Sequence, residues 1–175
     1  LTLMVLALFA HTRDKQWLQS VLPAIEKYYA FWVTEPHLHS ETGLSRFFDS
    51  GEGPAPEVIS DEKDDAGRTH YDRILEYYTT QKLDGIEAYY DPANERFTES
   101  FYQGDRSMRE SGFDCSHRFG LFNLEVTQYL PVCLNVLLYQ MEQDIAQIYQ
   151  ILVKDSKLWS DRARKRSQTI NQLMW

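Results

Sequence analysis

Residues 109–120, RESGFDCSHRFG, contain side chains that can donate or accept protons. They also contain a glycine, Gly112, which lets a ligand come close to the backbone. Asp114 follows Gly112 and Phe113. A glycine lets another group approach the backbone, and an aromatic neighbour favours the protonated form of a carboxyl group, which is the form a general acid needs near neutral pH. Arg118 would favour the carboxylate instead. The local sequence therefore also fits an Asp114 that caps a helix or pairs with Arg118.

A second candidate carboxylate, Glu57, lies in GEGPAPEV, where two prolines stiffen the chain. A rigid loop with one carboxylate can accept hydrogen bonds from sugar hydroxyls, and a surface glutamate fits the local sequence equally well. Arg46 precedes two phenylalanines. It can line the same cleft or pair with Asp49.

Metal-binding patterns in the sequence are weak. His37 and His39 form a His-x-His pair, but no further ligands follow at a suitable spacing. The acidic run 61–72 resembles a calcium loop, yet Lys63 and Ala66 stand where that loop needs an oxygen ligand and a glycine. We therefore expect a solvated acidic loop, no metal and no cofactor.

The composition predicts a globular domain that binds neither nucleic acid nor a membrane. The chain has 175 residues, of which 43% are hydrophobic and 14% aromatic, which is enough for one domain with a real core. The net charge of -8 argues against a nucleic-acid backbone or an anionic membrane as the main partner. The basic cluster of Arg162, Arg164, Lys165 and Arg166 is accordingly interpreted as a solvent-facing helix face.

Apolar residues at helical spacing predict an all-α protein, because no strand alternation persists. The predicted helices span 1–11, 14–32, 69–83, 97–108, 131–152 and 155–173. The first should be a buried helix end, Asp14 should cap the second, and Pro23 should kink or divide it. Residues 35–66 form a long loop. We expect this loop and residues 109–125 at the same end of a ring of helical hairpins.

Four segments, in the same order, resemble trehalases. RESGFDCSHRFG is similar to their ESGWD-containing signature, and GLSRFFDSGEGPAPEV to their GLSRY…PE segment. YLPVCLNVLLYQMEQDIA resembles their VDLNALLYK helix, while LTLMVLALF and LPAIEKYYAFW match in character and position. The style of these motifs is closest to the fungal neutral type, and the resemblance covers nearly the whole chain.

This resemblance implies an inverting glycosidase that hydrolyses α,α-trehalose to glucose. It implies that residues 1–175 are a single-domain part of an (α/α)6 toroid of the six-hairpin glycosidase type, truncated at both ends. Asp114 falls on the general acid, and Glu57, Arg109 and Gly112 fall on substrate-binding positions. The catalytic base belongs to a QWDxPxGWAP segment that this chain lacks, as it lacks PGGRF. The implied location is cytoplasmic.

Some residues depart from the common trehalase pattern. Phe113 replaces a tryptophan, Cys133 replaces the aspartate of DLN, and Pro54 to Val58 read PAPEV where many members have PRPES. A related toroid α-glucosidase with another substrate, or an inactive helical scaffold that binds sugar or protein, therefore stays an alternative. An enzyme needs Asp114 to face a cleft, whereas a scaffold lets it face solvent.

Overall fold

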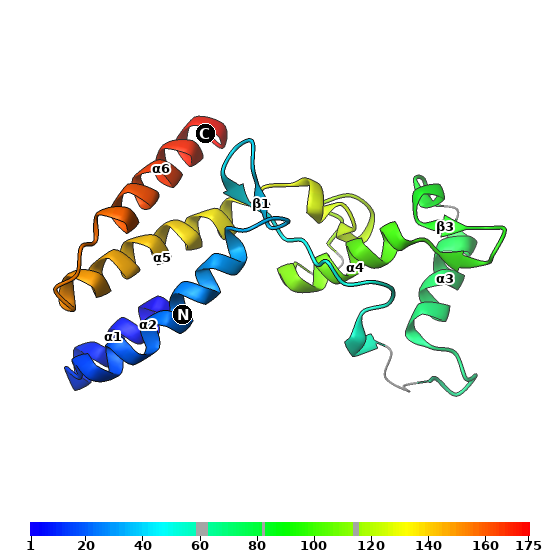
Figure 1. Ribbon diagram of the computed structural model, residues 1–175. Coiled ribbons are helices and arrows are strands. Elements are labelled where there is room, and N and C mark those ends of the chain that lie inside the picture. Colours follow the sequence, from blue (N-terminus) through cyan, green and yellow to red (C-terminus); the bar gives the residue numbers. More distant parts are fainter. Residues whose placement is uncertain (59–62, 82, 114–115) are drawn as a thin grey trace. The chain divides into compact units, whose positions relative to one another are not determined.

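The computed structural model describes residues 1–58, 63–81, 83–113 and 116–175, with only the backbone of Glu57 (Figure 1). Over these residues the chain forms six α-helices: α1 Thr2–Thr12, α2 Lys15–Trp32, α3 His70–Gln81, α4 Glu99–Ser111, α5 Val132–Ile151 and α6 Lys157–Leu173. Single 3-10 turns lie at η1 Pro56–Val58, η2 Ile86–Ala88, η3 Leu121–Asn123 and η4 Val126–Gln128. The predicted helices are confirmed, with ends shifted by a few residues.

The chain divides into two compact units. The first unit comprises residues 1–46 and 130–175, and the second comprises residues 47–129. The first therefore holds α1, α2, α5 and α6, and the second holds α3 and α4. That both belong to one catalytic domain stays a prediction.

In the first unit the predicted cap of α2 is confirmed, whereas Pro23 does not divide this helix. The carboxylate of Asp14 accepts a hydrogen bond from the Trp17 amide at 3.0 Å, so this residue caps α2. Pro23 lies inside α2 and the helix continues past it. Of the two expected outcomes, the division is therefore wrong and the kink stays a prediction. A proline removes one backbone donor, but the helical bonds on either side remain.

The expectation that the first helix is buried is also corrected. Within α1 only Thr2 and Phe9 are buried, and Thr2 donates to the Asp144 carboxylate at 2.6 Å. Several apolar side chains at this end are exposed, namely Leu1, Leu3, Met4 and Leu8. A narrow row of α1 side chains packs against α5. The other apolar residues of α1 are left uncovered by the described part of the chain.

Two short antiparallel hairpins interrupt the helical pattern. β1 Leu38–His39 pairs with β2 Leu44–Ser45, and β3 Tyr90–Asp91 pairs with β4 Arg96–Phe97. The sequence analysis did not find them, because a two-residue strand is too short to show alternation. A helix holds the first hairpin from the side: the amide of Asn135 in α5 accepts from the Ser45 backbone N–H and donates to the Ser45 carbonyl, both at 2.8 Å.

A buried ion pair joins the helices of the first unit. The Arg166 guanidinium in α6 donates to the Glu142 carboxylate in α5 at 2.9 Å and to the Asn135 side-chain oxygen at 3.1 Å. Tyr29 of α2 donates to the same carboxylate at 2.6 Å, and burial together with Glu142 raises the pKa of its hydroxyl to about 12. Arg166 was expected on a solvent-facing surface. That interpretation is wrong for Arg166, which is buried against Glu142, whereas Arg162, Arg164 and Lys165 of the same cluster are exposed.

The core of the second unit is aromatic. One cluster of its buried residues comprises Tyr78, Tyr89, Phe97, Phe101 and Leu124. The rings of Phe97 and Phe101 stack with centroids 3.7 Å apart and planes 9° apart. Gly104 lets α4 approach the next segment closely, since a Cβ at this position would lie 2.5 Å from the Leu124 carbonyl oxygen. The close contact positions the polar end of α4, residues 105–112.

Candidate functional site

Two of the predicted site residues, Arg109 and Gly112, lie at the C-terminal end of α4. Arg109 occupies its last turn, and Gly112 ends it in the left-handed conformation at φ 67°. No described atom lies within 4 Å of a Cβ built on Gly112, so glycine is favoured here by the backbone conformation and not by lack of space. Glu57 belongs to η1, and its side chain is not described. The predicted acid, Asp114, lies outside the described residues, so the shared site of these two carboxylates stays a prediction.

Arg109 is held by a neighbour one helical turn away. Its Nε donates to Oδ2 of Asp105 at 3.0 Å, and Asp105 is buried. The same oxygen accepts a hydrogen bond from the Tyr71 hydroxyl at 2.7 Å. Tyr71 in turn accepts a hydrogen bond from the backbone N–H of Ala55 at 3.0 Å. The segment that leads to Glu57 is thereby connected to Arg109.

A buried arginine that the sequence analysis missed organises the glycine-rich loop. The guanidinium of Arg106 donates to the Asp49 carboxylate at 2.8 Å and to the carbonyl oxygens of Gly51 and Gly53. It also contacts the exposed Glu99 carboxylate at 3.2 Å. Neither carbonyl belongs to a strand of the two described hairpins. A charged donor stabilises such acceptors strongly. Arg106 therefore gives the loop a defined shape.

Two further side chains of α4 bind the start of the same loop. The Phe48 backbone N–H donates to Oε2 of Glu110 at 2.8 Å, and the Asp49 backbone N–H donates to Oγ of Ser107 at 2.9 Å. The charged residues of α4 recur one turn apart, which is the spacing of one helix face. That spacing was a usable signal, because a charged face over a long glycine-rich loop predicts side chains that bind loop backbone.

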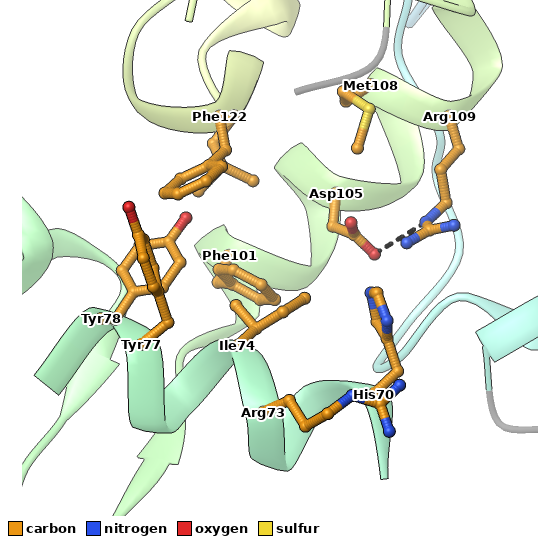
Figure 2. A pocket seen from close by; sticks show the side chains of 11 residues that line it. His70, Arg73, Ile74, Tyr77, Tyr78, Phe101, Asp105, Met108, Arg109 and Phe122 are labelled. Carbon is orange, nitrogen blue, oxygen red and sulfur yellow. Dashed lines mark hydrogen bonds and ion pairs between the residues drawn. The ribbon is translucent and has the colours of Figure 1, made fainter. Parts of the chain in front are cut away.

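Arg109 lines two cavities within the second unit. The smaller has a volume of about 280 Å³ and lies between Arg109, Pro56, Asp49, Arg106 and Glu110. The larger has a volume of about 450 Å³, and Figure 2 shows the side chains that line it. Since Pro56 directly precedes Glu57, the smaller cavity brings the two predicted substrate-binding segments together.

The larger cavity has one aromatic side and one charged side (Figure 2). Tyr77, Tyr78, Phe101 and Phe122 gather on the aromatic side, and the Asp105–Arg109 ion pair lies above the His70 ring on the other. Burial lowers the pKa of His70, and the positive charges of Arg109 and Arg73 lower it further against the opposing effect of Asp105. Aromatic faces with a few fixed polar groups suit ligands such as sugars.

Phe113, the residue that precedes the predicted acid by one position in the sequence, packs against other aromatic rings. The ring of Phe113 contacts the ring of Phe47 at 5.6 Å and that of Phe119 at 5.1 Å between centroids. The Arg118 guanidinium lies 5.7 Å from the centre of the Phe113 ring. Phe113 thus anchors the end of α4 to the start of the glycine-rich loop.

The remaining sequence candidates have structural partners. Nε of Arg46 donates to the Pro36 carbonyl at 3.0 Å, while the carboxylate of Asp49, its alternative partner, binds Arg106. The Nδ1 atom of His39 lies 3.0 Å from the Thr42 hydroxyl. Among the residues that the structure describes, no group of three or more histidine, cysteine, aspartate or glutamate side chains could hold a metal ion.

Comparison with known proteins places this chain among helical glycosidases. The trehalase family model matches residues 1–175. The chain belongs to the trehalase family. Its sequence is 32% identical to the cytosolic neutral trehalase of Saccharomyces cerevisiae over 87% of this chain, and 29% identical to that of Emericella nidulans over 89%. It spans 21% and 23% of the lengths of these relatives, so it corresponds to about a fifth of each.

The fold agrees with the family. The structure matches neutral trehalase Nth1 from Saccharomyces cerevisiae with a TM-score of 0.73 and 26% sequence identity, over 99% of this chain and 34% of that chain. The fold class is therefore all-α, and the chain corresponds to part of a trehalase toroid. No described helix combines the length and hydropathy that a membrane span requires.

Proposed function

We propose that the protein containing this chain is a trehalase that hydrolyses α,α-trehalose to glucose with inversion. Membership of the trehalase family carries the proposal. The relatives are named cytosolic neutral trehalases, and on this basis we also propose a cytoplasmic location and a single catalytic domain that includes both units. The binding partner is then the disaccharide itself.

In this proposal each predicted site residue has a separate role in the reaction. Asp114 donates a proton to the glycosidic oxygen as the bond to the leaving glucose breaks. A base from another part of the protein activates water on the opposite face, roughly 6.5 to 9.5 Å from the acid. Glu57 accepts hydrogen bonds from sugar hydroxyls and Arg109 donates them. Gly112 ends α4 so that the chain can turn toward position 114.

The arrangement around α4 supports these roles physically. Six backbone groups between Phe48 and Ala55 bind α4 side chains or Tyr71, so the approach to Glu57 is held against the helix that carries Arg109. Held groups lose little freedom when substrate binds, which favours a precise site. A solvent-exposed scaffold loop would not need so many charged anchors.

The central test replaces Asp114 with asparagine in the full-length protein, meaning the reading frame that supplies the remaining length of the relatives. Asparagine keeps the shape but cannot donate a carboxylic proton. We expect kcat for trehalose to fall on the order of a hundred- to ten-thousand-fold, with trehalose binding by calorimetry largely retained. Asp84→Asn, a change at an exposed aspartate of the same unit, is the matched control. A variant within a few-fold of wild type would exclude the acid role.

Two further assays separate the alternatives. Wild-type protein that cleaves another α-linked disaccharide faster than trehalose would indicate a related toroid glucosidase, and protein that binds sugar without any turnover would indicate a scaffold. The isolated 175-residue chain should release no glucose, since its base lies elsewhere. Glucose released by this chain above its own Asp114→Asn control would show that the chain contains a base.

A further inference from the structure

Tyr71 connects two segments of the second unit through one hydroxyl group. It lies in the first turn of α3, next to His70. Its hydroxyl donates to Oδ2 of Asp105 at 2.7 Å and accepts from the Ala55 backbone N–H at 3.0 Å. Both of these partners are buried, so water does not replace either bond without rearrangement of the unit.

The two bonded partners lead directly to the proposed sugar-binding residues. Ala55 precedes Glu57 by two residues, with Pro56 between them. Asp105 uses the same carboxylate oxygen to accept from Nε of Arg109 at 3.0 Å. A single hydroxyl and a single carboxylate oxygen therefore span the gap between the loop of Glu57 and the guanidinium of Arg109.

Among the described residues, side chains of α4 hold the loop up to Gly53. Glu110, Ser107 and Arg106 bind the backbone of residues 48–53. In the described part of the chain, the next backbone bond from this loop to another segment joins the Ala55 N–H to the Tyr71 hydroxyl. The last turn before Glu57 thus depends on Tyr71 more than on the Arg106 contacts.

Aromatic neighbours fix the direction of the hydroxyl. The Tyr71 ring meets those of Phe97, Phe101 and Tyr102 edge to face, with centroids 6.4, 6.0 and 5.5 Å away. Burial raises the pKa of the hydroxyl well above its ordinary value, and the bond to Asp105 raises it further. The group therefore stays protonated, and it can donate to Asp105 throughout the neutral range.

We propose that Tyr71 is a positioning residue of the sugar site, whose hydroxyl sets the place of the Glu57 segment relative to Arg109. The inference rests on the proposed trehalase function. Tyr71→Phe keeps the ring but leaves the Ala55 N–H without its partner and Asp105 with one donor fewer. The loop relaxes, and the two substrate-binding groups no longer hold their separation.

The test compares steady-state kinetics of the full-length wild type, Tyr71→Phe and Tyr102→Phe. Tyr102 is half-buried in the same aromatic cluster, so its variant controls for the loss of a hydroxyl there. We expect KM for trehalose to rise about tenfold in Tyr71→Phe, with kcat within about threefold of wild type, because binding common to the ground state and the transition state is lost. Tyr102→Phe should keep the wild-type KM.

The outcomes that overturn the inference are distinct from those that overturn the function. A merely structural role would lower the unfolding temperature and the fraction of active protein without raising KM. An active wild type with an unchanged KM in Tyr71→Phe, or the same rise in Tyr102→Phe, therefore overturns the positioning role alone. A wild type without activity on trehalose overturns the proposed function, and this inference with it.

Discussion

Each unit buries one arginine, and the two arginines have different partners. In the first unit Arg166 binds the side chains of Glu142 and Asn135, which both lie on α5. In the second unit Arg106 binds the carbonyls of Gly51 and Gly53 together with the Asp49 carboxylate. One guanidinium joins helix to helix, and the other joins a helix to a loop.

This difference indicates a different role for each network. The backbone N–H and C=O groups of a helix already form hydrogen bonds within that helix. An ion pair between two helices therefore mainly determines how they pack. A loop has no such internal bonds, so the side chains that bind its carbonyls determine its shape. We therefore expect substitutions in the Arg166 network to change stability, and substitutions around Arg106 to change substrate affinity and turnover as well.

Removal of Glu142 should have the largest effect. Glu142→Ala leaves the buried Arg166 charge without its carboxylate, and the loss of one partner of a buried pair typically costs about 3 to 5 kcal/mol of stability. Denaturant unfolding of the full-length protein measures this loss, and KM of the remaining folded protein should stay within twofold of wild type. Recovery of stability in Glu142→Leu/Arg166→Met is the control, because a matched apolar pair leaves no unpaired charge.

Little destabilisation in Glu142→Ala, or a clear rise in its KM, would break the distinction between the two networks. The first result would mean that the ion pair does not determine packing. The second would mean that the first unit also shapes the substrate site.

Replacement of Arg106 should mainly affect catalysis. Arg106→Met removes the donors that hold Gly51 and Gly53, and the loop before Glu57 moves. A displacement of about 1 Å in such a site can reduce the rate about a hundredfold, so kcat/KM should fall by that order. Arg164→Met, at an exposed arginine that pairs with Asp161, is the control and should match wild type. Equal kcat/KM values in both variants would contradict a loop-shaping role.

Gly104→Ala tests the close contact that positions α4. A Cβ at this position would lie 2.5 Å from the Leu124 carbonyl oxygen and 2.9 Å from its Cα. Alanine normally favours a helix, but overpacking of this kind costs about 1 to 3 kcal/mol. Thermal unfolding should show the loss, whereas Gln103→Ala in the same helix should not. A Gly104→Ala variant as stable as wild type would mean that the 121–128 segment moves aside easily.

The smallest expected effect is a pH dependence from His70. Its pKa in the folded protein lies below the ordinary value of 6.5, because of burial and the charges of Arg109 and Arg73. As pH falls below about 6.5 the unfolded chain binds a proton that the folded chain does not, so stability decreases with falling pH. His70→Gln should therefore lose less stability than wild type between pH 7 and pH 5. Parallel unfolding curves for the two proteins would argue against this role of His70.

The sequence by itself determined the helices and the family. A helix repeats every 3.6 residues, so apolar spacing and a nearby cap such as Asp14 are local signals that need no knowledge of packing. The resemblance of RESGFDCSHRFG and the other three segments to trehalase motifs led to the family and to Arg109 and Gly112 as candidates. The analysis placed both in a loop after a helix ending at Met108, whereas Arg109 lies in the last turn of α4 and Gly112 ends that helix. Their roles remain proposals, as do those of Asp114 and Glu57.

Only the tertiary structure decided which charged side chains are buried and what they bind. Arg166 and Arg164 belong to one basic cluster in the sequence, yet one is buried against Glu142 and the other pairs with Asp161 at the surface. Tyr71 likewise reaches Asp105 across 34 positions of the chain. Such contacts depend on how helices pack at long sequence separation, and a local pattern contains no information about the partner on the other side.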